Sequence, residues 1–125
     1  MIRSLAAGAL AGLVLVTPAF AFRAQNGKFV EALGPDTFVV KWSGKSSPKD
    51  FWCAAGDFAN RRMHVSPATR LYRYESGRRN PGEGIVFGLT PRSDTGTGTL
   101  RLAGGPGMKV AHARILCEDL RERGR

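Results

Sequence analysis

Two cysteines and two histidines are the residues of this 125-residue sequence best suited to chemistry. Cys53 lies in the stretch DFWCAAGDFA, and Cys117 lies near the C-terminal end. Thioredoxin-type redox chemistry needs a Cys-x-x-Cys pair, structural zinc needs about four Cys or His ligands, and no local signature marks a papain-like nucleophile. We therefore predict a disulfide between the two cysteines, with two buried free thiols or chemistry at sulfur as the alternatives.

The predicted disulfide would contribute much of the stability of so small a protein. It closes a loop of about 65 residues, for which the chain-entropy model gives roughly 4 kcal/mol. A domain of this size has a total free energy of unfolding of about 5 to 15 kcal/mol. Disulfides of this kind are typical of oxidising compartments outside the cytosol.

The histidines have no partners arranged for catalysis in the sequence. His112 and Asp119 lie on one face of a predicted helix but two turns apart, too far for a direct hydrogen bond. His64 lies at the end of another predicted helix, and no Ser-His-Asp arrangement can be assigned. We predict no catalytic residue, no metal site and no cofactor.

The tripeptide Asp94-Thr95-Gly96 is the one that aspartic proteases use to activate water. In those enzymes it follows an apolar strand, whereas here Pro91, Arg92 and Ser93 precede it. Asp and Gly are also frequent turn residues, so we interpret this segment as a turn.

The segment AGGPGMKV, residues 103–110, places glycines and Lys109 at the start of a predicted helix, where backbone N–H groups can hold an anion. A nucleotide-binding P-loop requires Ser or Thr after the lysine, but Val110 follows it here. We interpret this segment as a flexible connector into a helix.

An arginine-rich stretch indicates binding most directly. The net charge is +9, and the stretch RLYRYESGRR contains Arg70, Arg73, Arg78 and Arg79 together with two tyrosines. Arginine combined with aromatic rings suits recognition of phosphate, carboxylate or stacked rings. We predict that these four arginines form an anion-binding face; the alternative is a surface on which they only confer solubility.

The N-terminal segment predicts export. A cation at Arg3, an apolar run over 5–16 and Ala-Phe-Ala at 19–21 match a signal peptide cleaved after Ala21. The alternative is a retained membrane anchor, but the run is shorter than the roughly 20 apolar residues that span a bilayer. We expect the signal peptide 1–21 to be removed and 22–125 to form a single domain without a transmembrane anchor, periplasmic or secreted.

Two local elements are predicted after the signal peptide. Residues 28–42 predict a β-hairpin, because apolar residues alternate with others around a Gly-Pro-Asp turn. A helix is predicted from about Pro48 to Met63, with Ser47 as N-cap and Asp50 in its first turn. One apolar stripe of this helix faces the sheet, and Cys53 lies nearly opposite.

The second cysteine lies on another predicted helix, over 108–123. Its apolar stripe comprises Val110, Ala113, Leu116, Cys117 and Leu120. Because Cys53 points away from the sheet, we expect this helix to lie across the outer or lateral side of the first one, with Gly56 allowing a close approach.

Three further strands are predicted between the helices, in TRLYRYES (69–76), GIVFGLTP (84–91) and TLRLAG (99–104). The element order is therefore ββαβββα. It predicts the α+β class, a small and mostly antiparallel sheet with two helices on one side.

These features predict a non-catalytic exported domain that acts as a binding or accessory protein of the cell envelope. Its expected partner is an anionic envelope component or another envelope protein, and no specific nucleic acid is expected. The sequence does not determine an oligomeric state. The alternatives are a small exported hydrolase or enzyme accessory subunit whose site the linear sequence does not reveal, and a structural protein that pairs through an exposed apolar patch.

Overall fold

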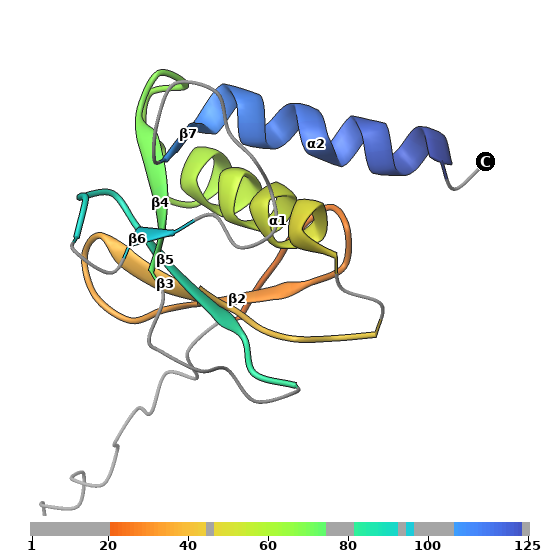
Figure 1. Cartoon of the computed structure of the whole chain (residues 1–125), viewed down its shortest axis with the longest axis horizontal. Helices are drawn as coiled ribbons and strands as arrows, with labels where there is room; N and C mark the ends of the chain where they lie inside the picture. Colours follow the sequence, from red (N-terminus) through yellow and green to blue (C-terminus); the bar gives the residue numbers. More distant parts are fainter. Residues whose placement is uncertain (1–20, 45–46, 75–81, 93–94, 97–106, 124–125) are drawn as a thin grey trace, which may run out of the picture.

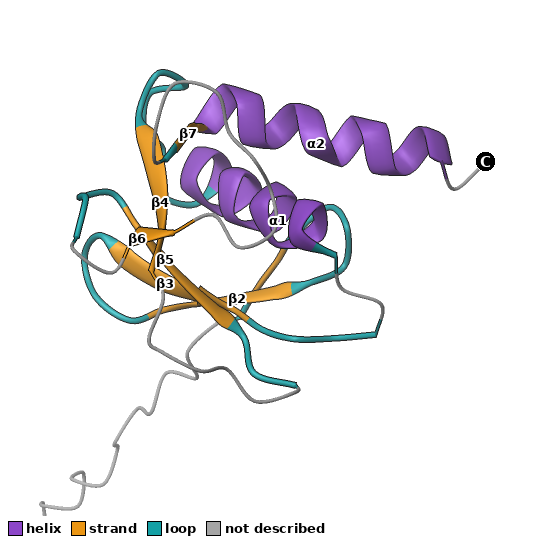
Figure 2. Ribbon diagram, in the orientation of Figure 1, coloured by secondary structure: helices purple, strands orange, loops and turns teal. Residues whose placement is uncertain are grey.

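The computed structural model describes residues 21–44, 47–74, 82–92, 95–96 and 107–123. In this part of the chain an antiparallel sheet, helix α1 (Pro48–Arg61) and helix α2 (Val110–Arg123) form three successive layers (Figure 1). Both helices lie on one side of the sheet, with α1 against the sheet and α2 beyond α1 (Figure 2). The predicted α+β class is confirmed.

The sheet is built from short strands that all pair in antiparallel fashion. The strands are β1 (Phe22–Arg23), β2 (Phe29–Ala32), β3 (Thr37–Val40), β4 (Arg70–Tyr74), β5 (Ile85–Gly88), β6 (Thr95–Gly96) and β7 (Met108–Lys109). Their order is β1-β2-β3-β5-β4-β6, and β7 also pairs with β4. Because β5 lies between β3 and β4 and is antiparallel to both, β3 and β4 run parallel and α1 is the crossover that joins them.

Strand register assigns each residue to one of two faces, since side chains alternate along a strand. Val30 lies opposite Val40, and Phe38 lies opposite Phe87. All four are fully buried beneath α1, so this side is the inner face of the sheet. The alternate row, Glu31, Val39, Val86 and Tyr74, lies on the other side, which we call the open face.

Helix α1 begins as the sequence predicts. The backbone N–H of Ser47 donates to Asp50 Oδ2 at 2.7 Å, and Pro48 occupies the first turn, where its missing N–H costs nothing. The helix ends at Arg61, two residues before the predicted end, and His64 adopts a left-handed conformation with φ of 57°. This conformation reverses the chain direction at a helix C-terminus, a position that glycine usually occupies.

Helix α1 is buried on its outer side as well as on its sheet side, with residues 51–59 all buried. The predicted disulfide is present, and the Cα atoms of Cys53 and Cys117 are 4.9 Å apart. Gly56 lies against α2 so closely that a Cβ there would approach the Ala113 Cβ to 2.7 Å and the Arg114 backbone N to 3.2 Å. The expected packing of α2 on the outer side of α1, with close approach at Gly56, is confirmed.

The short strands are the main difference from the predicted element order. β1 and β7 are not predicted, and β6 lies where the sequence predicts a turn. Each has two residues, too few for the alternation that identifies a strand in a sequence. The predicted strand at 99–104 lies outside the described residues.

Residues 1–20, which carry most of the predicted signal peptide, also lie outside the described part of the chain. Within that part, neither helix has the length and hydropathy needed to cross a bilayer.

Candidate functional site

Positive charge gathers on the open face of the sheet. Strand pairing places Arg23 beside Phe29, and Arg70 beside Lys109, with their side chains directed away from α1. Lys41 follows β3 on the same side and forms an ion pair with Glu31 at 3.0 Å. Among the described residues that register or ring contact places on this face, the cations are Arg23, Lys41, Arg70, Arg92 and Lys109, and the one carboxylate is Glu31.

Aromatic rings accompany these cations. The Arg92 guanidinium lies over the Tyr74 ring, 4.2 Å from its centroid, and the Arg23 guanidinium lies 6.0 Å from the centroid of the exposed Phe29 ring. The Tyr74 hydroxyl donates to the Thr90 carbonyl at 2.5 Å, which fixes the ring under Arg92. A guanidinium stacked on a fixed ring is held in one orientation.

The structure separates the arginines that the sequence groups together. Arg70 and Arg73 are an odd number of residues apart on β4, so they project from opposite faces of the sheet. Arg73 pairs with Phe87 on the inner face, whereas Arg70 lies on the open face and donates to the Gly107 carbonyl at 3.1 Å. Arg78 and Arg79 lie outside the described residues. Anion binding itself remains a prediction.

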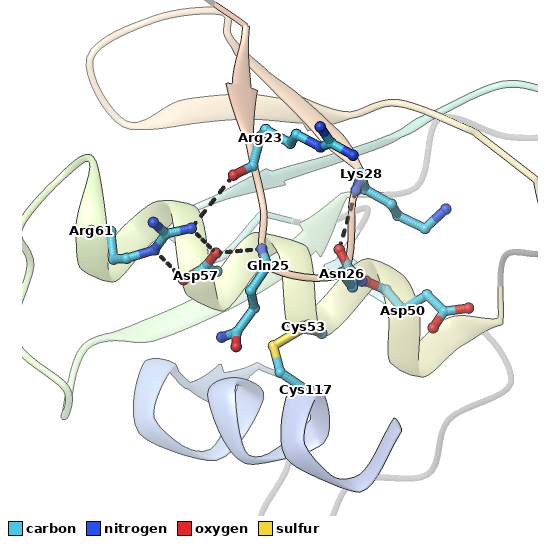
Figure 3. The surroundings of a disulfide bond; sticks show 9 residues. All are labelled: Arg23, Gln25, Asn26, Lys28, Asp50, Cys53, Asp57, Arg61 and Cys117. Carbon is cyan, nitrogen blue, oxygen red and sulfur yellow. Dashed lines mark hydrogen bonds and ion pairs between the residues drawn. A yellow bond between two sulfur atoms is a disulfide. The ribbon is translucent and has the colours of Figure 1, made fainter. Parts of the chain in front are cut away.

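Asp57 is the fully buried charge of the described core, and its contacts give it a structural role (Figure 3). It accepts hydrogen bonds from the Gln25 backbone N–H at 2.9 Å and from Arg61 Nε at 2.7 Å. Burial raises the pKa of Asp57, but the hydrogen bonds from Arg61 and Gln25 and the charges of Arg61 and Arg114 lower it more, so the pKa lies below the ordinary 3.8. The carboxylate thereby ties the segment between β1 and β2 to α1.

Lys28 is also buried, at 3% exposure, on the inner face. Its Nζ donates to the Ser43 carbonyl at 3.1 Å and lies 4.9 Å from the Phe51 ring centroid. Burial lowers the pKa of Lys28, and the nearby Asp50 partly offsets this effect. Lys28 is therefore a tether within the fold rather than part of the open face.

The start of α2 uses its own N–H groups within the protein. The Val110 N–H donates to the Thr69 carbonyl at 2.9 Å, and the Ala111 N–H donates to the Pro67 carbonyl at 3.0 Å. These two groups do not hold an anion at the helix start.

The residues considered for catalysis or metal binding are dispersed. His64 and His112 are exposed on different elements, and Cys53 and Cys117 are consumed by the disulfide. The protease-like Asp94 lies outside the described residues. Where the structure is described, no three His, Cys, Asp or Glu side chains come together as a metal-binding group.

The anion-binding face predicted from the sequence lacks four of the cations found on the open face: Arg23, Lys41, Arg92 and Lys109. Lys41 lies next to Trp42 in a predicted strand, so the alternation of side chains along the strand predicts the face of the sheet on which Lys41 lies. Arg23 and Lys109 lie on two-residue strands that carry no signal of their own. Their contribution depends on pairing with β2 and β4, which only the fold reveals.

No protein-family model, curated protein or solved structure matches this chain. Any functional assignment therefore has to come from the geometry of its own residues.

Proposed function

We propose that this protein is an exported, non-catalytic binding domain that holds an anionic component of the cell envelope on the open face of its sheet. The supporting observation is the contrast between the two faces: the inner face is sealed under α1, and the open face carries cations and aromatic rings with a single, already paired carboxylate among its described residues. Such a surface attracts phosphate or carboxylate groups over a distance of about a Debye length, roughly 8 Å in physiological salt.

The arrangement of this face suits an extended ligand with repeated charges. Arg23 and Lys41 lie on the β1-β2-β3 side, while Arg70, Arg92 and Lys109 lie on the β4 side. The half-buried Val39 and Val86 lie between these two groups. A lipid surface, a phosphorylated lipopolysaccharide or an anionic glycan offers anionic groups at several places, and all of these are envelope components.

The disulfide supports an oxidising compartment, because such bonds are uncommon in cytosolic proteins. We expect the protein recovered from the periplasm or the medium to begin at Phe22. N-terminal sequencing or intact-mass measurement tests this. An N-terminus at Met1 in membrane-bound material would contradict cleavage after Ala21.

An exported hydrolase is the second candidate. It requires a pocket that brings a histidine, a carboxylate and backbone donors together. The groove that the described residues form beside α2 contains neither histidine. The binding proposal has the cations and aromatic rings of the open face in its support, whereas this groove does not favour a hydrolase.

Heparin provides a direct test as a soluble polyanion. The disulfide-bonded protein is expected to bind heparin in dilute buffer and to release it as salt rises, because the Debye length falls from about 10 Å at 0.1 M to about 3 Å at 1 M. Arg23→Gln, Arg92→Gln and Lys109→Gln should each weaken binding, and the triple variant should abolish it. Vesicles with and without anionic lipid then distinguish a lipid surface from a glycan.

Arg70 and Arg73 give a matched pair on one strand. Arg70→Gln should weaken heparin binding, whereas Arg73→Gln should not, because Arg73 projects from the inner face. Arg62→Gln, at the exposed end of α1, controls for net charge. Equal losses in all three variants would show that binding depends on total charge and not on the open face.

A further inference from the structure

A groove lies beside α2, between this helix, the end of α1, the segment after β1 and the segment before β4. Its volume is about 600 Å³, within the range of small-molecule sites. The polar residues that line it are Gln25, Asn60, Arg114 and Glu118, and the apolar ones are Pro67, Val110, Ala111 and Ile115. The Gln25 side chain extends from the segment after β1 toward α2 (Figure 3).

Arg114 lines this groove and also carries an unsatisfied donor. Its Nε is buried and has no hydrogen-bond acceptor among the described residues. The neighbouring carboxylate of Asp57 is already bonded by Arg61 and by the Gln25 backbone N–H. A buried N–H without an acceptor costs about 1 to 3 kcal/mol, so the protein gains stability if the Arg114 guanidinium turns toward an acceptor in the groove.

The charges around the groove match a zwitterion better than a polyanion. Arg114 and Glu118 are four residues apart on α2, about 6 Å along its axis, and both line the groove. They form no ion pair with each other within the described structure, although the charge of Arg114 also interacts with Asp57, which Arg61 already pairs with. The carboxylate of Glu118 repels a ligand with several negative groups, which separates this groove from the open face.

The remaining lining matches a peptide. Carboxamides both donate and accept, as a peptide group requires, and Gln25 and Asn60 supply two of them. Ile115, which is 59% exposed, and the exposed Pro67 and Ala111 supply an apolar wall for small aliphatic side chains. Two extended residues span at most about 7 Å, close to the spacing between Arg114 and Glu118 along the helix.

We propose that this groove binds short aliphatic peptides with two free termini, with Arg114 holding the C-terminal carboxylate and Glu118 holding the N-terminal ammonium. A planar guanidinium holds a carboxylate through two parallel hydrogen bonds. The site is independent of heparin binding, because no residue of the open face lines it.

The test uses one dipeptide and two derivatives that each lack one charge. The disulfide-bonded protein, as cells accumulate it and labelled with ¹⁵N, is titrated with Ala-Leu, N-acetyl-Ala-Leu and Ala-Leu amide, and the amide and arginine Nε–H resonances are followed by NMR. Ala-Leu should shift the Arg114 Nε–H and the Gln25 and Asn60 carboxamide signals. Each derivative should bind about tenfold more weakly, which corresponds to about 1.4 kcal/mol.

Variants assign each terminus to its partner. Glu118→Gln should weaken Ala-Leu binding about tenfold but leave N-acetyl-Ala-Leu unchanged, and Arg114→Gln should weaken Ala-Leu but leave the amide unchanged. Arg62→Gln and Arg70→Gln, outside the groove, should change neither. Thermal unfolding identifies any variant that has lost its fold, and the three ligands on the unmodified protein decide the question without variants.

Two results would overturn the proposal. One is the absence of groove shifts with Ala-Leu at millimolar concentration, which would leave bound water as the acceptor for Arg114. The other is equal affinity for the dipeptide and both derivatives, since the charged termini would then play no part. Loss of heparin binding with retained peptide binding, or the reverse, would separate this proposal from that for the open face.

Discussion

The two faces of the sheet are made from the same short strands but are stabilised in different ways. On the inner face, Phe38, Val40 and Phe87 are fully buried under α1, which is in turn covered by α2 and joined to it by the disulfide. On the open face, side chains are held by ring stacking and by one exposed ion pair. Burial of a large apolar side chain contributes about 1.5 to 3 kcal/mol, whereas an exposed ion pair contributes at most about 1 kcal/mol.

The stability of the fold therefore depends mainly on the inner side. We expect the open face to accept substitutions without a large loss of stability. Substitutions between the sheet and α2 should therefore alter stability, and substitutions on the open face should alter binding.

The largest effect is expected from removing the disulfide. Replacing Cys53 and Cys117 together by alanine should lower the free energy of unfolding by roughly 4 kcal/mol, since the unfolded chain gains the freedom that the closed loop denies it. Urea unfolding of the variant and of the reduced protein checks this. A loss below about 1 kcal/mol would mean that noncovalent packing alone holds α2 in place.

The next effect is expected at Asp57, whose carboxylate ties the N-terminal segment to α1. Asp57→Asn should cost about 2 to 3 kcal/mol at neutral pH, because Arg61 and Arg114 lose their buried counter-charge. Glu31→Gln, which breaks the exposed pair with Lys41, is the control and should cost less than about 1 kcal/mol.

The Asp57 effect should also depend on pH. Since the pKa of Asp57 is lower in the folded protein than its ordinary 3.8, the carboxylate stabilises the fold above that value, and this contribution is lost as pH falls through the folded pKa. The difference in unfolding free energy between the unmodified protein and Asp57→Asn should be constant near neutrality and shrink below about pH 4. A difference that grows with acid would contradict the assigned ion pair.

A smaller effect is expected at Gly56, where α1 and α2 approach most closely. Gly56→Ala should lower stability by about 1 to 2 kcal/mol, because the added methyl group meets Ala113 and the backbone of Arg114, although alanine favours a helix by up to about 1 kcal/mol. Addition of Ala113→Gly should restore part of the loss. If Gly56→Ala alone increased stability, α1 and α2 would not be in close contact at this position.

The smallest effect is expected on the open face. Arg23→Gln and Lys109→Gln should each change the free energy of unfolding by less than about 0.5 kcal/mol, as is usual for exposed side chains. The same variants should weaken heparin binding. A stability loss as large as that of Gly56→Ala would show that the open face also stabilises the fold, contrary to the distinction between a structural inner side and a binding open face.

The parts of the fold that the sequence predicts are those with a local signal. The N-cap at Ser47, the alternation of Phe38 and Val40, and the position of Cys53 opposite the apolar stripe are each properties of a few neighbouring residues. From them the layer order and the disulfide follow. The insertion of β5 between β3 and β4 does not, since it depends on contacts between distant segments.

The candidate sites are less visible in the sequence for a related reason. Clustered arginines in one stretch suggest one surface, yet Arg70 and Arg73 are sent to opposite faces by strand parity. Conversely, Gln25, Asn60 and Arg114 belong to three different elements and meet only because α2 packs on α1. Residues that come together only through the packing of three layers are not marked by any regular spacing in the sequence.

The position of the disulfide also determines how the molecule responds to mechanical load. A force applied through the two ends of the chain passes from the N-terminal hairpin into α1 and crosses directly to α2 at Cys117. The chain between the two cysteines, which are 64 positions apart, is therefore bypassed. Stretching the oxidised protein should release only the hairpin and the last residues of α2. Reduction should add about 220 Å of extensible chain, at roughly 3.4 Å for each residue.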